Sequence, residues 1–364
     1  MEFKSLTPSL YLYMINIINH CLTLKMKFIL AIIINILFIV SNINNIFIDA
    51  KHCPDLIKTF EQFKEIFNKH YESIEAENVA RINFEKSLRY VEANQDMASI
   101  NHFADLSNEE FRNKYLIKYD DFVMDANMPK YVDPKNLTHC NEFLPKNFPK
   151  EFDLRKLKTL SKIYQQGGCS SCWAFAALAA VESAYLASGQ NVTELSIQEL
   201  IDCQTENDGC NGGYIFLALD YVLKHGVLTD KSYPYERITQ KCELPKIGKR
   251  YHIKNWCLIY NGNHTEEIKQ ALVNYRTAIP VQIIIKNSQP FFLYNGKSIL
   301  REDLGQELNV HEVNIVGWGL DNNGIEYWIM RNSWGTSWGD NGYGYIEMNK
   351  NLFGIESFPH VVTI

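Results

Sequence analysis

Four side chains of the sequence have the chemical types that nucleophilic catalysis by a thiol requires. Cys172 opens the apolar run "CWAFAALAAVESAY", which is typical of a buried helix, and the N-terminus of a helix favours a thiolate. His311 opens the strand-like run "HEVNIVGWG", and Asn332 follows "YWIMR". The imidazole of His311 could take up the thiol proton, and the amide of Asn332 could orient the imidazole. Gln166, six residues before Cys172, could donate to an oxyanion together with the backbone N–H of Cys172.

Cys169 and Cys172 also form a Cys-x-x-Cys pair, for which zinc binding, redox exchange and a structural bridge are alternative explanations. The sequence has no second Cys-x-x-Cys and no His-x-x-x-His that would complete a zinc site. No βαβ pattern surrounds Cys169, as a thioredoxin-like redox pair would require. Nine cysteines occur, and seven remain when Cys21 and Cys53 in the N-terminal part are set aside. An odd number in a secreted protein indicates intermolecular pairing or a free, reactive thiol.

The N-terminus has the features of a secretory targeting segment. Met26 and Lys27 precede a run of thirteen residues, 28–40, that is apolar except for Asn35, a length that fits a signal sequence better than a membrane span. We therefore assign residues 1–50 to this segment, with Met26 as an alternative start and an uncleaved signal anchor as the alternative interpretation. No other stretch is long and apolar enough to span a bilayer, so no membrane anchor is expected. Secretion agrees with three N-glycosylation sequons, at Asn136, Asn191 and Asn263.

The composition excludes some partners. The chain has 364 residues, of which 46% are hydrophobic and 21% are charged, as in ordinary globular proteins. The net charge is −6 and no basic stripe is present, which argues against nucleic acid as a partner. Twenty tyrosines and twenty phenylalanines suffice for packed cores and for a peptide-binding cleft.

Two regions of different character follow the targeting segment. Residues 54–116 are charged and helix-periodic, with Glu77, Arg81 and Phe84 on one helix face and Ser107 as the predicted cap of a later helix. Residues 117–136 have an acidic start and two prolines, which suits a cleavable linker. Strand-like runs separated by glycine and asparagine turns dominate beyond residue 278. Helices followed by antiparallel strands indicate an α+β fold with two lobes.

Five short motifs, "QGGC", "GCSSCWAF", "CNGGY", "NSWG" and "WGDNGYGY", occur in this order in the C-terminal part of the chain. "GCSSCWAF" resembles the Cys-Gly-Ser-Cys-Trp signature of papain-like cysteine peptidases, and the order of the other motifs is that of the same family. From about residue 55 onward the chain is therefore similar to this family. Residues 51–136 resemble the family's helical inhibitory propeptide and linker, and residues 137–364 its mature domain. The matching propeptide positions are Glu77, Arg81, Phe84, Asn101, Phe103 and Asp105. Several stretches look similar to the mite group 1 allergen branch.

The resemblance implies a papain-like fold, in which a helical lobe faces an antiparallel, β-barrel-like lobe. It further implies a secreted cysteine endopeptidase, made as a zymogen, that cleaves peptide bonds through a thioester and uses no metal or other cofactor. The implied partners are protein and peptide substrates, the chain's own propeptide and cystatin-type inhibitors. The implied location is the extracellular space or a digestive lumen, with the lysosome as an alternative.

The resemblance also implies a role for each matched residue. Cys172 would be the nucleophile, His311 its acid–base partner, Asn332 the group that orients the ring, and Gln166 an oxyanion donor. Trp334 would shield the bond between Asn332 and His311 from water. The implied substrate-binding residues are Gly212, Gly213, Tyr214, Ile215 and also Trp334. The implied disulfides are Cys169–Cys210, Cys203–Cys242 and Cys140–Cys257, which leave Cys172 free.

Two residues depart from the family pattern near this site. Ser170 replaces the usual glycine between the two cysteines, and Glu312 replaces a small apolar residue after His311. Glu312 would raise the imidazole pKa if its carboxylate lies close, and would do little if strand alternation turns it away. The main alternative function is a catalytically silent paralogue that binds proteins or inhibitors. An adhesion or structural glycoprotein would leave the free thiol and the propeptide unexplained.

Overall fold

The computed structural model describes residues 57–118, 140, 148–259 and 264–364. They belong to two compact units. The first unit contains the residues up to Ala93 together with Ser99–Asp105, and the second contains Asn94–Ala98 and Leu106–Ile364. The predicted targeting segment, most of the predicted linker, and the sequons at Asn136 and Asn263 lie outside the described residues.

The first unit is built on helices α3 (Phe60–Phe67) and α4 (Ile74–Ala93). Thr59 begins α3 with a capping box: its hydroxyl accepts from the backbone N–H of Gln62, whose side chain accepts from the backbone N–H of Thr59. These bonds satisfy N–H groups that the first turn of a helix leaves without partners. The sequence at the start of α3 therefore defines where the helix begins.

Helix α4 carries the predicted face of Glu77, Arg81 and Phe84. The ring of Phe84 is buried and packs between those of Phe60 and Phe63, with centroid distances of 5.7 and 5.1 Å. The guanidinium of Arg81 is half-exposed and forms an ion pair at 2.8 Å with Glu61 of α3. Aromatic burial thus contributes most of the stability of this helix pair, since exposed ion pairs contribute little.

The second unit combines helices with an antiparallel sheet, as predicted. Its sheet is centred on β5, with which β1, β2, β4 and β6 all pair, while β7 pairs with β6; β3 and β8 form a separate ribbon. The helices are α5 (Asn108–Tyr115), α6 (Cys172–Ala187), α7 (Ile197–Cys203), α8 (Ile215–His225), α9 (His264–Tyr275) and α10 (Ser288–Phe292). The strands are β1 (Ile117–Lys118), β2 (Phe152–Asp153), β3 (Asn255–Leu258), β4 (Ile279–Ile285), β5 (Asn309–Leu320), β6 (Glu326–Arg331), β7 (Tyr343–Glu347) and β8 (His360–Thr363).

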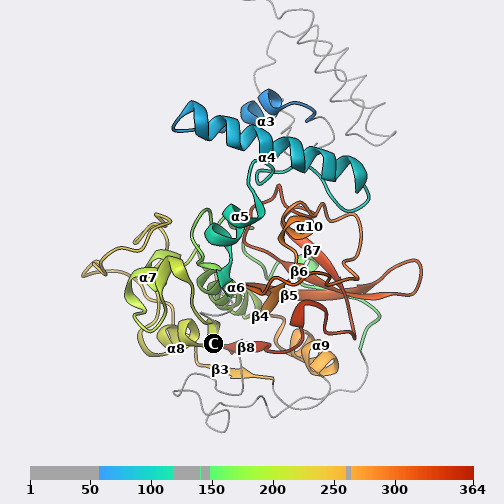
Figure 1. Cartoon of the computed structure of the whole chain (residues 1–364). Helices are drawn as coiled ribbons and strands as arrows, with labels where there is room; N and C mark the ends of the chain where they lie inside the picture. Colours follow the sequence, from blue (N-terminus) through green and yellow to red (C-terminus); the bar gives the residue numbers. More distant parts are fainter. Residues whose placement is uncertain (1–56, 119–139, 141–147, 260–263) are drawn as a thin grey trace, which may run out of the picture. The chain divides into compact units, whose positions relative to one another are not determined.

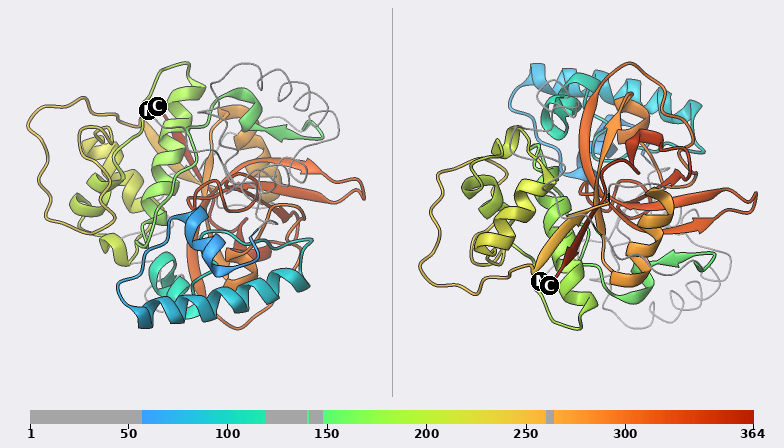
Figure 2. Two further views of the ribbon diagram at one scale, coloured as in Figure 1. Left: turned by 90° about the horizontal axis from the view of Figure 1, so that it is seen from above. Right: turned by 90° about the horizontal axis from the view of Figure 1, so that it is seen from below.

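Helix α6 and strand β5 form the centre of this unit. Figures 1 and 2 show α6, α7 and α8 gathered on one side and strands β4 to β7 on the other, which is the predicted division into a helical and a β lobe. Helix α6 is buried from Cys172 through Ala184, in keeping with its single charge at Glu182. That carboxylate accepts hydrogen bonds from Tyr164 and from the backbone N–H of Leu195, each at 2.8 Å. All of β5 is buried except Leu320.

Local signals account for several element boundaries in this unit. Ser107 caps α5, because its hydroxyl accepts from the backbone N–H of Glu110 and the Glu110 carboxylate accepts from the backbone N–H of Ser107. Ser196 caps α7 in a similar way through the backbone N–H of Glu199. In the described part of the chain, no helix combines the length and the apolar character that a membrane crossing needs.

Candidate active site

Cys172 occupies the first turn of α6, where backbone N–H groups point at its sulfur. Among the described residues it is the one free cysteine, and it is completely buried. The described disulfides are Cys169–Cys210, Cys203–Cys242 and Cys140–Cys257, the same three pairs that the family resemblance implies. The Cys-x-x-Cys pair is therefore one bridged cysteine beside one free thiol.

His311 and Asn332 are brought together by the sheet. His311 lies on β5 and Asn332 directly follows β6, the neighbouring strand. Nε2 of His311 lies 2.8 Å from Oδ1 of Asn332. The same oxygen accepts from the backbone N–H of Ser333 at 2.7 Å, so Nε2 of His311 is the donor and its proton is fixed there. The indole of Trp334 stacks on the imidazole with ring centroids 4.4 Å apart.

Strand β5 also supplies a direct contact to the thiol. The backbone N–H of Glu312, the residue after His311, donates a hydrogen bond to the sulfur of Cys172. Four residues further along α6 and two further along β5, the side-chain amide of Asn314 donates to the carbonyl of Ala176 at 2.9 Å and ties the two elements together. Helix α6 and strand β5 thus bring the thiol of Cys172 to the backbone next to His311.

Four hydrogen bonds fix the side-chain amide of Gln166. Its Oε1 accepts from the hydroxyl of Ser333 at 2.8 Å and from the indole N–H of Trp334 at 3.1 Å. Its Nε2 therefore carries the amide protons, and it donates to the carbonyl of Cys169 at 3.0 Å and to that of Tyr115 at 3.3 Å. The orientation of this amide is consequently set by the residues around Asn332.

Residues 107–118 cover the site. Strand β1 pairs antiparallel with β5, with Ile117 opposite Val310 and Lys118 opposite Asn309. Continuing this register by one residue places Leu116 opposite His311. The carbonyls of Tyr115 and Leu116 accept from Gln166 and from Ser170, respectively. An extended segment therefore lies along the groups that would bind a peptide.

Two contacts anchor this segment further from the thiol. The ring of Phe111 on α5 is buried against Phe292 and, edge-on, against Trp334, with centroids 4.6 and 5.0 Å away. Arg112 forms an ion pair with Glu307, whose carboxylate also accepts from the hydroxyl of Ser288. Aromatic packing and one shared ion pair thus hold α5 against the part of the unit that carries the thiol and the imidazole.

Burial keeps the thiol and the imidazole neutral in this covered form. Burial raises the pKa of Cys172, and the nearby Glu312 carboxylate raises it further. Burial also lowers the pKa of His311 to about 4, outweighing the hydrogen bond to Asn332, which acts in the opposite direction. Of the two alternatives for Glu312, the one in which it does little to the imidazole therefore agrees with the structure, because desolvation and the bond to Asn332 set the His311 pKa. The pKa of Glu312 itself is raised well above its usual range by burial.

Of the predicted substrate-binding residues, Gly212 lies directly against the covering segment. Gly212 has a φ of 138°, and a Cβ at this position would lie 2.8 Å from the side chain of Ile117, so the bare backbone permits the close approach. Tyr214 precedes α8 and is half-buried, while Ile215 begins that helix and is buried. A Cβ on Gly213 would collide with neighbouring side chains of the same lobe.

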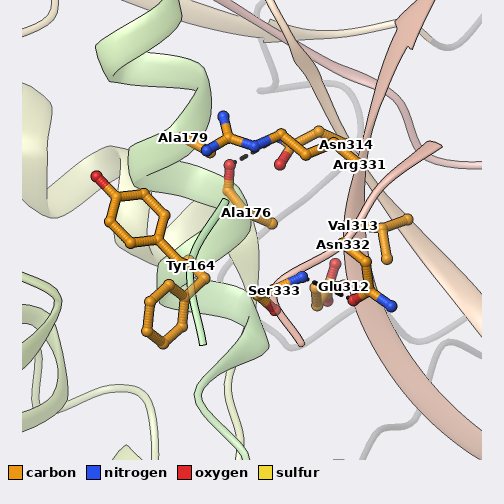
Figure 3. Close-up of a pocket in the computed structure, with 10 residues that line it drawn as sticks. Tyr164, Ala176, Ala179, Glu312, Val313, Asn314, Arg331, Asn332 and Ser333 are labelled. Atoms are coloured by element: carbon orange, nitrogen blue, oxygen red, sulfur yellow. Dashed lines mark hydrogen bonds between the residues drawn. The ribbon is translucent and has the colours of Figure 1, made fainter. Parts of the chain in front are cut away.

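A small cavity lies between α6 and the strands β5 and β6, behind the hydrogen bond of His311. Figure 3 shows its lining, in which Glu312 and Asn332 lie below Arg331 and opposite Tyr164. Oε2 of Glu312 and Nη1 of Arg331 are buried, and neither has a hydrogen-bond partner among the described residues. The Glu312 carboxylate nevertheless lies close enough to Cys172 to raise the pKa of the thiol.

Sequence reasoning missed one residue that supports the site. The hydroxyl of Tyr235 donates to the backbone carbonyl of Gln166 at 2.6 Å and lies 2.9 Å from the hydroxyl of Ser171. It thereby connects the turns on either side of the Cys169 loop. Tyr235 stands in the irregular stretch after α8, and no local pattern distinguishes it from the other tyrosines.

Family models of known proteins match both the region that carries Cys172, His311 and Asn332 and the helical region before it. A family model described as "Papain family cysteine protease" matches residues 148–363, and one described as "Cathepsin propeptide inhibitor domain" matches residues 60–111. The chain is 45% identical over 309 residues to "Peptidase 1" of Dermatophagoides farinae, covering 85% of this chain and 94% of the relative. It is 44% identical over 306 residues to "Peptidase 1" of Psoroptes ovis, covering 84% and 92%.

Solved structures give the same picture. One reported for the mite allergens Blo t 1 and Der p 1 is 33% identical, with a TM-score of 0.68, and covers 85% of this chain and all of its own. The proform of Amb a 11, a cysteine protease of ragweed pollen, is 29% identical, with a TM-score of 0.70, and the match covers 84% of this chain and 93% of that one.

Proposed function

Because the chain belongs to the papain family of cysteine proteases and carries the inhibitory propeptide of a zymogen, we propose that Cys172 is its nucleophile. His311 is the acid–base partner, and Asn332 is the group that orients the imidazole. The observation that carries this assignment is the free thiol at the start of α6 beside the strand whose His311 bonds Asn332 at 2.8 Å. Trp334 keeps water from that hydrogen bond by stacking on the ring.

The proposed reaction proceeds in two stages. The thiol of Cys172 gives its proton to His311, and the thiolate attacks the carbonyl carbon of the scissile peptide bond. Nε2 of Gln166 and the backbone N–H of Cys172 stabilise the resulting oxyanion. The imidazolium protonates the departing amine, which leaves a thioester on the enzyme. A water molecule, deprotonated by His311, then hydrolyses the thioester, releases the carboxylic acid and restores the thiol.

Substrate binding is proposed to use exposed backbone. Gly212 and Gly213 offer main-chain groups to an extended peptide, in the manner of an added strand, and Tyr214 and Ile215 border the same path. The support is the position of Ile117, whose side chain already lies against the backbone of Gly212. The substrates are proteins and peptides, and cystatin-type inhibitors are proposed to compete for the same path.

Residues 1–50, 51–136 and 137–364 are proposed as the targeting segment, the propeptide with its linker, and the mature enzyme. Residues 115–118 reach the site in the full-length chain, which supports a propeptide that blocks the cleft until it is cut away. The protein is proposed to be secreted into the extracellular space or a digestive lumen, and the lysosome is the alternative location. Asn191, which is exposed after α6, is the described glycosylation candidate. Similarity to mite allergens extends the proposal to allergenicity.

Cys172→Ala tests the assignment in the mature enzyme. The variant should fail to hydrolyse a fluorogenic peptide and to react with a thiol-directed epoxide, whereas the disulfides and the melting temperature Tm should remain those of the wild type. The exposed substitution Glu302→Ala serves as a control that should keep both activities. Turnover or labelling in Cys172→Ala would refute the nucleophile. A wild-type enzyme that is labelled but cleaves no peptide would instead favour the silent paralogue, which no observation on the structure favours.

A further inference from the structure

Ser170 points a hydroxyl into the covered site from the loop between Gln166 and Cys172. The hydroxyl donates to the carbonyl of Leu116 at 3.0 Å, and the backbone N–H of Ser170 donates to the carbonyl of Cys210 at 2.9 Å. The Cys169–Cys210 disulfide holds the same loop. Only 3% of Ser170 is exposed. The loop therefore presents this hydroxyl from a fixed backbone rather than from a flexible arm.

The position of this hydroxyl relative to Gln166 defines what it can reach in a bound peptide. Nε2 of Gln166 contacts the carbonyl of Tyr115, and Ser170 contacts the carbonyl of the next residue, Leu116. Neighbouring Cα atoms in a chain are 3.8 Å apart. Consider a peptide whose scissile carbonyl is bound by Gln166. The side chain of the residue that carries this carbonyl, and the backbone carbonyl of the neighbouring residue, would then lie within reach of Ser170.

The adjacent serine shows that this orientation is specific to Ser170. The hydroxyl of Ser171 lies 3.4 Å from the carbonyl of Cys169 and 2.9 Å from the hydroxyl of Tyr235. Both of these partners belong to the enzyme part of the chain. Of the two consecutive serines, Ser170 bonds the segment that fills the site, and Ser171 bonds its own lobe.

We propose that Ser170 is a specificity-determining residue that favours substrates with a hydrogen-bond acceptor, such as the amide of glutamine, on the side chain of the residue carrying the scissile carbonyl. Departure of the covering segment removes the Leu116 acceptor. An apolar substrate side chain would then bury the hydroxyl without a partner, whereas a side-chain amide would restore the hydrogen bond. The inference rests on the proposed function, because it takes Cys172 and Gln166 as catalytic groups.

Two peptide substrates that differ only at this residue, glutamine in one and methionine in the other, test the inference. In the mature wild type, kcat/KM should be higher for the glutamine substrate than for the methionine substrate, so that the ratio of the two values exceeds one. Ser170→Gly and Ser170→Ala should each reduce this ratio by about 2- to 10-fold, the range for one neutral hydrogen bond. Ser170→Thr, which keeps the hydroxyl, and Ser171→Ala, which removes the neighbouring one, should keep the ratio of the wild type.

A second measurement uses the full-length chain. Loss of the bond to Leu116 should increase the rate at which an epoxide probe labels Cys172 in the proenzyme by about the same factor in Ser170→Gly. Equal substrate ratios in wild type and both Ser170 variants would overturn the specificity role, even if labelling of the proenzyme increases. Absence of turnover in the mature wild type would refute the proposed function itself, so the two failures are distinguishable.

Discussion

Nε2 of His311 and Oδ1 of Asn332 are 2.8 Å apart, and the oxygen is identified by a second hydrogen bond that it accepts from the backbone N–H of Ser333. The proton of the imidazole is therefore held on the nitrogen that faces Asn332. Nδ1, which has no hydrogen-bond partner among the described residues, is the nitrogen available for proton exchange. In the proposed mechanism, catalysis by this pair depends on keeping that tautomer.

Asn332→Ala should lower kcat by about 5-fold, since one hydrogen bond that positions the ring contributes about 1 kcal/mol. KM should change little, because Asn332 is buried behind the imidazole. Steady-state kinetics of the mature enzyme on a fluorogenic peptide measures both constants. Asn323→Ala, in an exposed turn after β5, is the matched control. An unchanged kcat in Asn332→Ala would show that the ring is oriented by Trp334 alone.

Arg112→Gln should weaken the hold of α5 on the enzyme. The variant loses the ion pair with Glu307, so the rate of Cys172 labelling in the proenzyme should increase. Because both side chains are only partly buried, we expect an increase of about 2- to 5-fold. The measurement is the rate at which an epoxide probe labels Cys172 in the full-length proenzyme. Arg89→Gln, at an exposed position of α4, should leave this rate unchanged. A proenzyme labelled equally slowly in both variants would assign the anchoring to Phe111 instead.

Acid should destabilise the covered form through His311. Its pKa in the folded chain is about 4, below the ordinary value of 6.5, so the unfolded chain binds more protons between these two values. The stability contribution is complete above pH 6.5 and is lost as the pH falls to 4, by up to about 3 kcal/mol. Thermal melts of full-length Cys172→Ala, which cannot process itself, measure the loss of Tm.

Adding His311→Gln to that background should make Tm fall less steeply between pH 6.5 and 4, and the exposed control His70→Gln should not. Some pH dependence should persist, because burial also lowers the pKa of His360 to about 4. Identical melting curves in the His311 and His70 variants would mean that His311 is not desolvated by the covering segment.

Glu312→Gln should stabilise the full-length chain at pH 7.5 and leave it unchanged at pH 4. Burial raises the pKa of Glu312 in the folded chain, so the folded chain binds more protons than the unfolded chain once the pH exceeds the unfolded pKa. Glu312 therefore lowers the stability of the folded chain increasingly as the pH rises, and the substitution removes this loss. The same substitution should speed alkylation of Cys172 by iodoacetamide at pH 7.5, because the carboxylate no longer opposes the thiolate. A Tm increase of equal size at both pH values, or one shared by exposed Glu302→Gln, would contradict the electrostatic explanation.

The elements of this fold were largely predictable where the signal is local. Ser107 caps α5 because a serine and a glutamate three residues apart suffice for a capping box. The apolar run after Cys172 predicts a buried helix in the same way. The family resemblance placed Cys172 and His311 by matching motifs, and the structure brings α6 and β5 together at those positions.

Contacts between distant segments were not predictable from the sequence. Arg112 and Glu307 are separated by 195 residues, and neither belongs to a pattern that indicates the other. The sequence left the surroundings of Glu312 open, because β5 is buried along both faces and alternation alone does not tell which groups the side chain meets. Its carboxylate acts on Cys172, and desolvation rather than that charge sets the direction of the His311 pKa.

The Cys169–Cys210 disulfide gives the enzyme opposite redox requirements three residues apart. The loop that it closes carries Ser170 and leads into Cys172, so the oxidised pair maintains the scaffold while its neighbour must stay reduced to react. A mild reductant would rescue an enzyme whose proposed nucleophile, Cys172, has been oxidised. A strong one would also open the scaffold, so activity should pass through a maximum as reducing power increases.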